Sequence, residues 1–315
     1  MIKIKEELAY LKARRDIVKT LENKVESEGF IAIEPAFFDD YDRFQTMNQR
    51  IKKGSLVKVI GTNGSILLLR PDATTAIIRQ LMPMWNGGDE ARLYYNTTVF
   101  SKNNQGYIED IRQFGVEYLG GAATDADVDI IRLVIALLET FDLDFMIEIG
   151  NSKFLSGLMK TLVLSDEDCR NLKNMIHYKN RDDMNTFIQQ RVGSDHVGHL
   201  LSTLFLLQGS MADIRAILQH ESLEPLMQEA IQELDSLDQA LKSDNSLTRV
   251  TFDLSLLPTY DYYDGITFKV YLRQTPRPIL QGGRYDPLTL QFGQKVPAIG
   301  FSLNIQDFIK EVSKS

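Results

Sequence analysis

The segment Arg-Pro-Asp-Ala-Thr at 70–74 places a carboxylate and a hydroxyl between a predicted strand and a predicted helix. Polar side chains at the exit of a strand are candidates for a functional site. Short oxygen-bearing side chains at the start of a helix also accept hydrogen bonds from its free N–H groups. Asp72 or Thr74 therefore has two interpretations, and helix capping is favoured for the segment taken alone.

Two adjacent tyrosines, Tyr262 and Tyr263, lie in the unusual segment Tyr-Asp-Tyr-Tyr-Asp-Gly at 260–265. A tyrosine ring offers a flat apolar surface and one hydrogen-bonding hydroxyl, which suits it to holding an imidazole. Neighbouring side chains of an extended strand point to opposite faces, so we expect only one of the two to line a given pocket. Ordinary packing within a sheet is the alternative interpretation.

Other reactive side chains form no recognisable site. His196 and His199 are three residues apart, a spacing at which two imidazoles on a helix could share a metal ion. No cysteine lies nearby, and Gly193 and Gly198 argue against a firm helix, so we predict no metal site. Cys169 has no evident histidine partner, which argues against a nucleophilic role.

The elements that must position these side chains are strands near both ends of the chain and helices between them. Strands are predicted over 30–33, 56–60, 65–69, 93–100, 111–119, 145–149, 249–254, 266–272 and 298–303. Helices are predicted over 5–28, from Asp72 to the loop at 83–88, and over 126–141, where Asp127 and Asp129 are interpreted as caps. The segment from 165 to 242 has helical patterns. This order predicts an α+β fold with a mixed sheet and a helical insertion.

Glycines mark the predicted turns. Asn63-Gly64 separates two short strand-like runs and predicts a tight hairpin, in which both central residues take a positive φ. The pairs Gly120-Gly121 and Gly282-Gly283 lack the spacing of phosphate-binding loops and are interpreted as turn glycines.

Composition excludes several classes of protein. The 315 residues carry a net charge of −8, which provides no basic surface for sequence-independent nucleic-acid binding. No run of about 18 apolar residues and no signal-peptide core is present, so neither a membrane anchor nor secretion is predicted. A single cysteine excludes an internal disulfide and agrees with a cytoplasmic location.

Six segments, in the right order, resemble the catalytic core of histidyl-tRNA synthetase, a class II aminoacyl-tRNA synthetase. They are Pro35 after an Ile-rich run, 69–74, 112–117, 261–265 with Phe268, 281–286 and 297–301. The resemblance implies a core domain made of 1–165 and 245–315, with a mainly antiparallel sheet flanked by helices, and a helical insertion at 166–244. It also implies that Pro35 lies at a dimer interface.

The resemblance places a set of residues where the family contacts histidine: Asp72, Thr74, Gln113, Glu117, Tyr262, Tyr263 and Tyr285. A carboxylate such as Glu117 can pair with an imidazole N–H, and Asp72 with an α-ammonium. Asp72 is one methylene shorter than the family's glutamate, and Ala73 replaces a glycine, which bears on how well histidine fits.

Arginines of the family's catalytic machinery are replaced. Ser101 follows Phe100 where the second motif has an arginine, Asp307 lies at or near the nucleotide-binding arginine of the third motif, and Pro258 replaces the arginine before the tyrosine signature. Adenylate formation builds negative charge on a phosphate, and losing one preorganised donor costs about 10²–10³ in rate. The sequence therefore predicts no catalysis of its own and no cofactor.

The sequence also stops after the third motif, where a synthetase would continue into an anticodon-binding domain of roughly a hundred residues. These departures together resemble the regulatory subunits of ATP phosphoribosyltransferase. That family implies a hetero-octamer with a short catalytic subunit, four of each chain, in which histidine is the effector of the first step of histidine biosynthesis. A synthetase-like enzyme that activates histidine or a related acid with ATP is the alternative, and a tRNA-binding module is a third. The surface used by the partner, and whether histidine acts in the old pocket or at the subunit contact, stay open.

Overall fold

The computed structural model describes residues 4–42, 44, 53–103, 105–193, 195–243, 246–258, 262–273 and 275–313. Tyr260 and Asp261 of the tyrosine segment lie outside this range. The described residues form two compact units. Unit 1 comprises Met1–Ala126, Leu133–Leu143 and Asp286–Ser315, and unit 2 comprises Asp127–Arg132 and Asp144–Tyr285.

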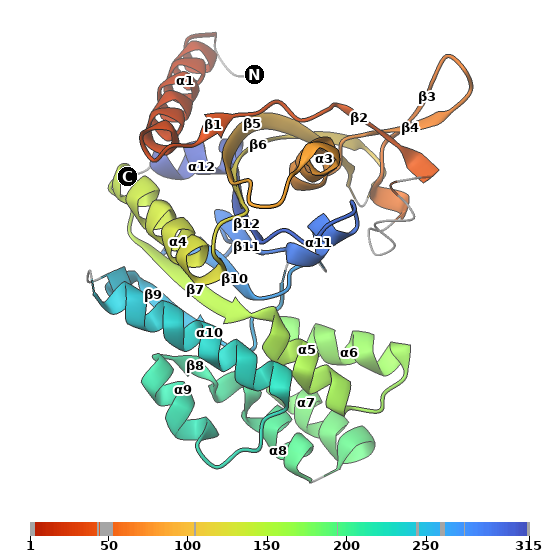
Figure 1. The fold of residues 1–315 in the computed structure, drawn as a ribbon, viewed down its shortest axis with the longest axis vertical. Helices are drawn as coiled ribbons and strands as arrows, with labels where there is room; N and C mark the ends of the chain where they lie inside the picture. Colours follow the sequence, from red (N-terminus) through yellow and green to blue (C-terminus); the bar gives the residue numbers. More distant parts are fainter. Residues whose placement is uncertain are drawn as a thin grey trace. The chain divides into compact units, whose positions relative to one another are not determined.

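Unit 1 contains one larger group of strands and one small sheet (Figure 1). The larger group has the order β1 (Ile31–Ala32), β5 (Ala91–Lys102), β6 (Ile108–Leu119) and β12 (Ala298–Asn304). Strand β6 pairs antiparallel with both β5 and β12, whereas β1 pairs parallel with β5. The small sheet has the order β2 (Phe38–Asp40), β4 (Ile66–Leu69) and β3 (Lys58–Ile60).

The helices of unit 1 carry buried apolar residues. They are α1 (Ile4–Ser27), α3 (Ala73–Leu81), most of α4 (Ala123–Glu139), α11 (Asp286–Leu290) and α12 (Ile305–Val312), with short 3₁₀ turns at Lys53–Ser55 and Met82–Met84. Helix α3 packs on β5 through a cluster that includes Ala73, Ile77, Tyr95 and Val99. This packing places the start of α3 beside the strands that carry the candidate ligand residues.

The hairpin between β3 and β4 is confirmed, but its predicted turn is wrong. The N–H of Gly61 donates to the carbonyl of Ser65 at 2.8 Å, and the N–H of Gly64 donates to the carbonyl of Gly61 at 3.0 Å. Gly64 has a φ of +80°, whereas Asn63 is not among the residues with positive φ. The side chain of Asn63 instead accepts a hydrogen bond from the N–H of Ser65, which closes a wider loop than the tight turn requires.

Unit 2 contains strands in the order β11 (Leu280–Arg284), β10 (Ile266–Leu272), β7 (Phe145–Asn151), β9 (Val250–Asp253) and β8 (Gln208–Gly209). Strand β10 pairs antiparallel with β11 and β7, and β7 pairs parallel with β9. Strand β11 was not predicted, because Gly282 and Gly283 were interpreted as turn glycines. Both lie inside the strand, and a Cβ on Gly283 would lie 2.8 Å from the carbonyl oxygen of Ile266 on β10. Close backbone approach, not a turn, requires this glycine.

The helices of unit 2 are α5 (Ser152–Thr161), α6 (Asp166–His177), α7 (Arg181–Phe187), α8 (His196–Thr203), α9 (Met211–Leu218) and α10 (Pro225–Lys242), with shorter turns at Ile188–Val192, Leu204–Leu206 and Ser246–Arg249. The predicted insertion, 166–244, supplies the helices from α6 to α10, and its boundaries stay a prediction. The α+β class with a mixed, mainly antiparallel pairing of strands is confirmed.

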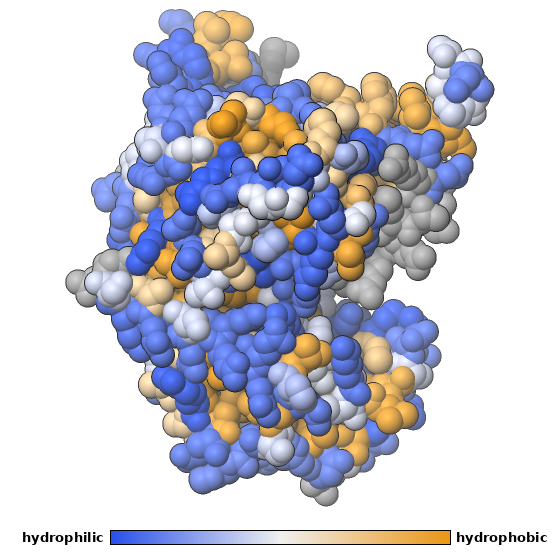
Figure 2. Space-filling model, viewed as in Figure 1, coloured by the Kyte–Doolittle hydropathy of each residue, from blue (hydrophilic) through white to orange (hydrophobic). Residues whose placement is uncertain are grey.

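Hydrophilic residues cover most of the face drawn in Figure 2, interrupted by separate apolar clusters. None of the helices in the described part of the chain is long and apolar enough to cross a membrane.

Candidate ligand-binding site

Asp72 caps helix α3, as the plainer interpretation of its segment predicted. Its carboxylate oxygen Oδ2 accepts hydrogen bonds from the N–H of Thr75 at 2.9 Å and from the Thr75 hydroxyl. The side chain is 9% exposed. Burial raises the pKa of Asp72 above its ordinary value, although hydrogen bonds from Thr75 and Thr74 act in the opposite direction. Capping occupies Oδ2, so a histidine-binding role for Asp72 stays a prediction.

Thr74 and Glu117 come together, although they are far apart in the sequence. The hydroxyl of Thr74 on α3 donates a hydrogen bond of 2.6 Å to Oε1 of Glu117 on β6, and Glu117 is only 1% exposed. Gly300 of β12 pairs with Glu117, and a Cβ at that position would lie 2.2 Å from Oε2 of Glu117. The carboxylate therefore lies over a backbone position that only glycine leaves open.

Gln113 lies on the same face of β6 as Glu117, because side chains of a strand alternate and these two are four residues apart. Gln113 is half-buried and pairs in register with Thr97 of β5 and Asn304 of β12. Gly115 lies between Gln113 and Glu117 on this face, and a Cβ there would lie 2.3 Å from the ring of Tyr95. Strand β6 thus carries Gln113 and Glu117 on one face, and the glycine between them leaves room for the ring of Tyr95.

Arg70 organises the backbone around this region, a role that sequence reasoning missed. Its guanidinium is 1% exposed and donates hydrogen bonds to the carbonyl oxygens of Pro35 and Thr98 and to the hydroxyl of Thr97. The Thr98 contact measures 2.8 Å. A buried guanidinium needs several acceptors, so an arginine directly after the apolar run 66–69 was the available signal.

Pro35 is buried, and its carbonyl is occupied by Arg70. Phe37 and Phe38, close after it, are each 50% exposed, so apolar surface lies beside Pro35. The prediction that Pro35 belongs to a dimer interface stays a prediction.

Unit 2 carries the tyrosine cluster, which we define as Tyr262, Tyr263 and Tyr285. The Tyr262 ring centroid lies 5.3 Å from that of Tyr263 and 6.1 Å from that of Tyr285, with interplanar angles of 82° and 74°. Tyr285 is 1% exposed and the other two are half-buried. These edge-to-face geometries are favourable for aromatic rings.

The premise that the two adjacent tyrosines lie in an extended strand was wrong, and how many of them line a pocket stays a prediction. Tyr262 lies in a turn and Tyr263 in an irregular segment, and β10 begins only at Ile266. The alternation of an extended strand therefore does not apply to them.

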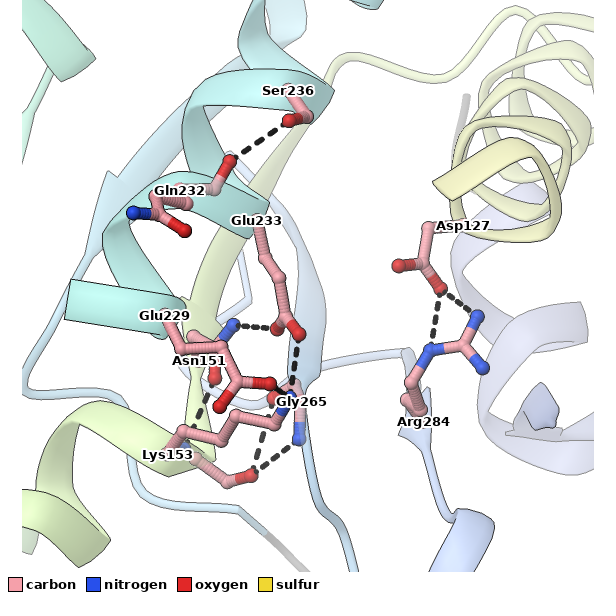
Figure 3. A network of polar contacts seen from close by, with 10 residues as sticks. Asp127, Asn151, Lys153, Glu229, Gln232, Glu233, Ser236, Gly265 and Arg284 are labelled. Atoms are coloured by element: carbon pink, nitrogen blue, oxygen red, sulfur yellow. Dashed lines mark hydrogen bonds and ion pairs between the residues drawn. The ribbon is translucent and has the colours of Figure 1, made fainter. Parts of the chain in front are cut away.

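Asp127 was interpreted as a helix cap, and this was also wrong. Helix α4 begins at Ala123, so Asp127 lies within it. Its Oδ1 accepts hydrogen bonds from Nε of Arg284 at 3.1 Å and from a terminal nitrogen at 2.5 Å, and both side chains are buried (Figure 3). Arg284 directly precedes Tyr285, so this buried ion pair helps to fix the tyrosine cluster.

The three positions at which the resemblance predicts that arginines are replaced lie in separate segments. Ser101 is half-buried on β5 and pairs in register with Glu109. Pro258 is half-buried after β9. Asp307 lies in the first turn of α12, is 59% exposed and forms an ion pair of 3.2 Å with Lys310. A carboxylate there also suits the positive end of the helix dipole.

The argument that Gly198 disfavours a helix at the two histidines was wrong. His196 and His199 lie on α8, and Asp195 caps that helix by accepting from the N–H of Gly198 at 2.9 Å. Each imidazole lies 2.9 Å from a different oxygen of Glu221. No cluster suited to holding a metal ion occurs within the ranges that the structure describes.

Comparison with known proteins shows which family the chain resembles. The model of the Histidyl-tRNA synthetase family matches residues 7–308. The ATP phosphoribosyltransferase regulatory subunit of Oceanobacillus iheyensis is 29% identical over 299 residues, which cover 94% of this chain and 73% of that protein. The ATP phosphoribosyltransferase regulatory subunit of Clostridium novyi is 30% identical over 303 residues, which cover 93% of this chain and 71% of that protein.

A solved structure supports the same relationship. An ATP phosphoribosyltransferase regulatory subunit/histidyl-tRNA synthetase from Bacillus halodurans matches with a TM-score of 0.84 and 26% identity, covering 96% of this chain and 79% of the other. The predicted class II synthetase-like fold is therefore confirmed.

Proposed function

Because the chain belongs to the histidyl-tRNA synthetase family, and within it to the regulatory subunits of ATP phosphoribosyltransferase, we propose that it activates the short catalytic subunit of that enzyme and relays feedback inhibition by histidine. In this role the chain performs no chemistry itself. Its assembly would be a hetero-octamer of four regulatory and four catalytic chains, in the cytoplasm, acting at the first step of histidine biosynthesis.

The observation that carries this proposal is a contrast between two sets of side chains. The side chains that could recognise histidine are present, whereas the arginines that could bind phosphate are replaced. Glu117 is buried and fixed by Thr74, over the glycine of β12. The tyrosine cluster is packed edge to face in unit 2. By the resemblance, Ser101 and Pro258 replace two of the family's arginines, and Asp307 lies at or near the position of a third.

Recognition of histidine follows from the chemistry of these groups. A carboxylate such as Glu117 accepts a hydrogen bond from an imidazole N–H. Tyrosine rings offer a flat surface and hydroxyl groups that suit an imidazole. We place Asp72 at the α-ammonium and Gln113 at the edge of the ligand. Histidine relays inhibition only if it binds one quaternary state more tightly than the other, because a ligand shifts an equilibrium by its differential affinity.

The proposal is tested by the rate of phosphoribosyl-ATP formation by the short catalytic chain, with and without this protein. We expect stimulation that saturates with added protein, and loss of that stimulation when histidine is added. The catalytic chain alone with histidine is the control. Absence of stimulation at saturating protein would remove the proposal.

Assembly is tested separately by co-purification with the short catalytic chain and a mass measurement of the complex. A mass equal to four copies of each chain is expected. Two proteins that elute separately at micromolar concentration would contradict the hetero-octamer.

A further inference from the structure

The end of strand β7 is tied to helix α10 by a buried carboxamide. Asn151 is 1% exposed and caps α5, where its Oδ1 accepts from the N–H of Lys153 at 3.0 Å. Its Nδ2 donates to Oε2 of Glu233 on α10 at 2.7 Å (Figure 3). Since both ends of the carboxamide are bonded, Glu233 holds the Asn151 side chain in one orientation.

Glu233 is itself held in place by Lys153. The Lys153 ammonium lies 2.5 Å from Oε1 of Glu233 and 2.6 Å from Oε1 of Glu229. Burial acts to lower the pKa of Lys153, but its hydrogen bonds to the two carboxylates outweigh burial and raise the pKa. Helices α5 and α10 also approach closely at Gly157, where a Cβ would lie 2.8 Å from Cγ of Met227. The contact between the two helices is therefore both polar and tightly packed.

The next residue, Ser152, is bonded to the turn at Gly265. The N–H of Ser152 donates to the carbonyl of Gly265 at 2.8 Å, and the N–H of Gly265 donates to the Ser152 hydroxyl at 2.9 Å. Gly265 has a φ of +134°, a conformation that favours glycine. A Cβ there would lie 3.0 Å from Cδ of Arg284, so the turn is confined on two sides.

Two tyrosines of the cluster lie just before this turn, and the turn is bonded to the residue that precedes the third. Tyr263 lies two residues before Gly265, and the N–H of Asp264 donates to the carbonyl of Arg284 at 2.8 Å. Tyr285 follows Arg284 directly. A displacement of the Gly265 turn therefore changes the relative positions of the three tyrosine rings.

We propose that Glu233 is a positioning residue for the tyrosine cluster, acting through Asn151 and Ser152 on the turn at Gly265. Helix α10 and the ligand-binding turn are then coupled: a change at either one alters the other. The identity of the ligand as histidine rests on the proposed function, whereas the coupling itself does not. By linkage, histidine that orders the tyrosine cluster also changes the conformation of α10 available to a partner.

The first test needs no ligand. Amide hydrogen exchange of the segment 262–268 is measured in the full chain carrying Glu233→Ala, with Glu229→Ala as the matched control. Both variants remove a carboxylate from Lys153, but only the first removes the partner of Asn151. We expect about tenfold faster exchange with Glu233→Ala and less than about twofold with Glu229→Ala, because a hydrogen bond to a charged group commonly contributes that much.

Equal effects of the two variants, or no effect of Glu233→Ala, would overturn the coupling. Urea unfolding shows whether each variant is folded. If Glu233→Ala is not, Glu233→Met replaces it, because methionine has a similar length and no oxygen to accept from Asn151.

The second test adds histidine. We expect Glu233→Ala to raise the Kd for histidine about tenfold, and histidine to slow exchange in α10 of the unchanged chain but not in this variant. If the unchanged chain does not bind histidine, the proposed function fails while the first test still decides the coupling. If histidine binds the Glu233→Ala variant as tightly as the unchanged chain, the coupling is overturned and the proposed function stands.

Discussion

Glu117 joins the two properties that a ligand-binding carboxylate needs, burial and a fixed orientation. Its side chain is 1% exposed, and the hydroxyl of Thr74 donates to Oε1 at 2.6 Å. A carboxylate removed from water forms stronger hydrogen bonds with a ligand donor than an exposed one does. At the scale of single residues, this side chain offers the sharpest test of the proposed histidine site.

We expect Glu117→Gln to weaken histidine binding by about ten- to a hundredfold, because hydrogen bonds to charged groups contribute roughly 1.5–3 kcal/mol. The new carboxamide oxygen can still accept from Thr74, so the fold should persist. Calorimetric titration with histidine measures the Kd. Glu109→Gln, the same change at an exposed position of β6, is the control. Equal affinities for Glu117→Gln and the unchanged chain would contradict the assignment.

The raised pKa of the buried Asp72 carboxyl predicts that the stability of the fold depends on pH. Burial raises its pKa above the ordinary value of 3.8, so the folded chain keeps a proton that the unfolded chain has already lost. The free energy of unfolding contributed by this group is therefore present below the ordinary pKa and is lost as the pH rises through the raised pKa. We expect Asp72→Asn to remove this loss of stability with rising pH, because asparagine does not titrate. Asparagine also caps helices, so helix α3 should persist. Urea unfolding at a series of pH values measures it, and an unchanged pH profile would refute it.

At the scale of elements, long regular segments could be predicted from the sequence and compact irregular ones could not. The strand pair β5 and β6 and helix α4 follow from extended patterns of apolar residues. Strand β11 was missed because glycine is usually a sign of a turn, whereas Gly283 is required by its close approach to Ile266 on β10.

The candidate site shows the same division. The resemblance supplied its residues, but no sequence pattern predicted the bond between Thr74 and Glu117, which joins a helix to a strand 43 residues away. The grouping of Tyr262 with Tyr263 depends on a turn that was taken for a strand. Contacts of this kind depend on tertiary structure, which local periodicity does not determine.

The pairing of β6 with β12 depends on Gly300. A Cβ there would lie 2.3 Å from the carbonyl oxygen of Val116 and 2.2 Å from Oε2 of Glu117. Backbone cannot move aside as a flexible side chain can, so we expect Gly300→Ala to lower the free energy of unfolding by about 1–3 kcal/mol. Urea unfolding measures this change. Gly54→Ala, where a Cβ would meet nothing within 4 Å, is the control, and equal stabilities of the two variants would contradict the argument.

At the scale of the whole molecule, adenylate formation needs cations contributed by segments far apart in the chain. By the resemblance, the family's arginines correspond to Ser101 on β5, to Pro258 after β9 and to a position at or near Asp307 on α12. Groups that act as a unit lose most of their effect when one is removed. We therefore expect any loss of catalysis to depend on several positions together and not on one substitution.

We expect the purified chain to show no histidine-dependent ATP–pyrophosphate exchange above background, assayed beside an active histidyl-tRNA synthetase. Restoring one cation with Ser101→Arg should leave exchange at background, because a single guanidinium cannot stabilise the charge that several donors share. The same preparation must stimulate phosphoribosyl-ATP formation by the catalytic chain, which shows that it is folded and competent. Exchange that requires both histidine and ATP in the unchanged chain would favour the synthetase-like alternative, since pyrophosphate is released only when an adenylate forms.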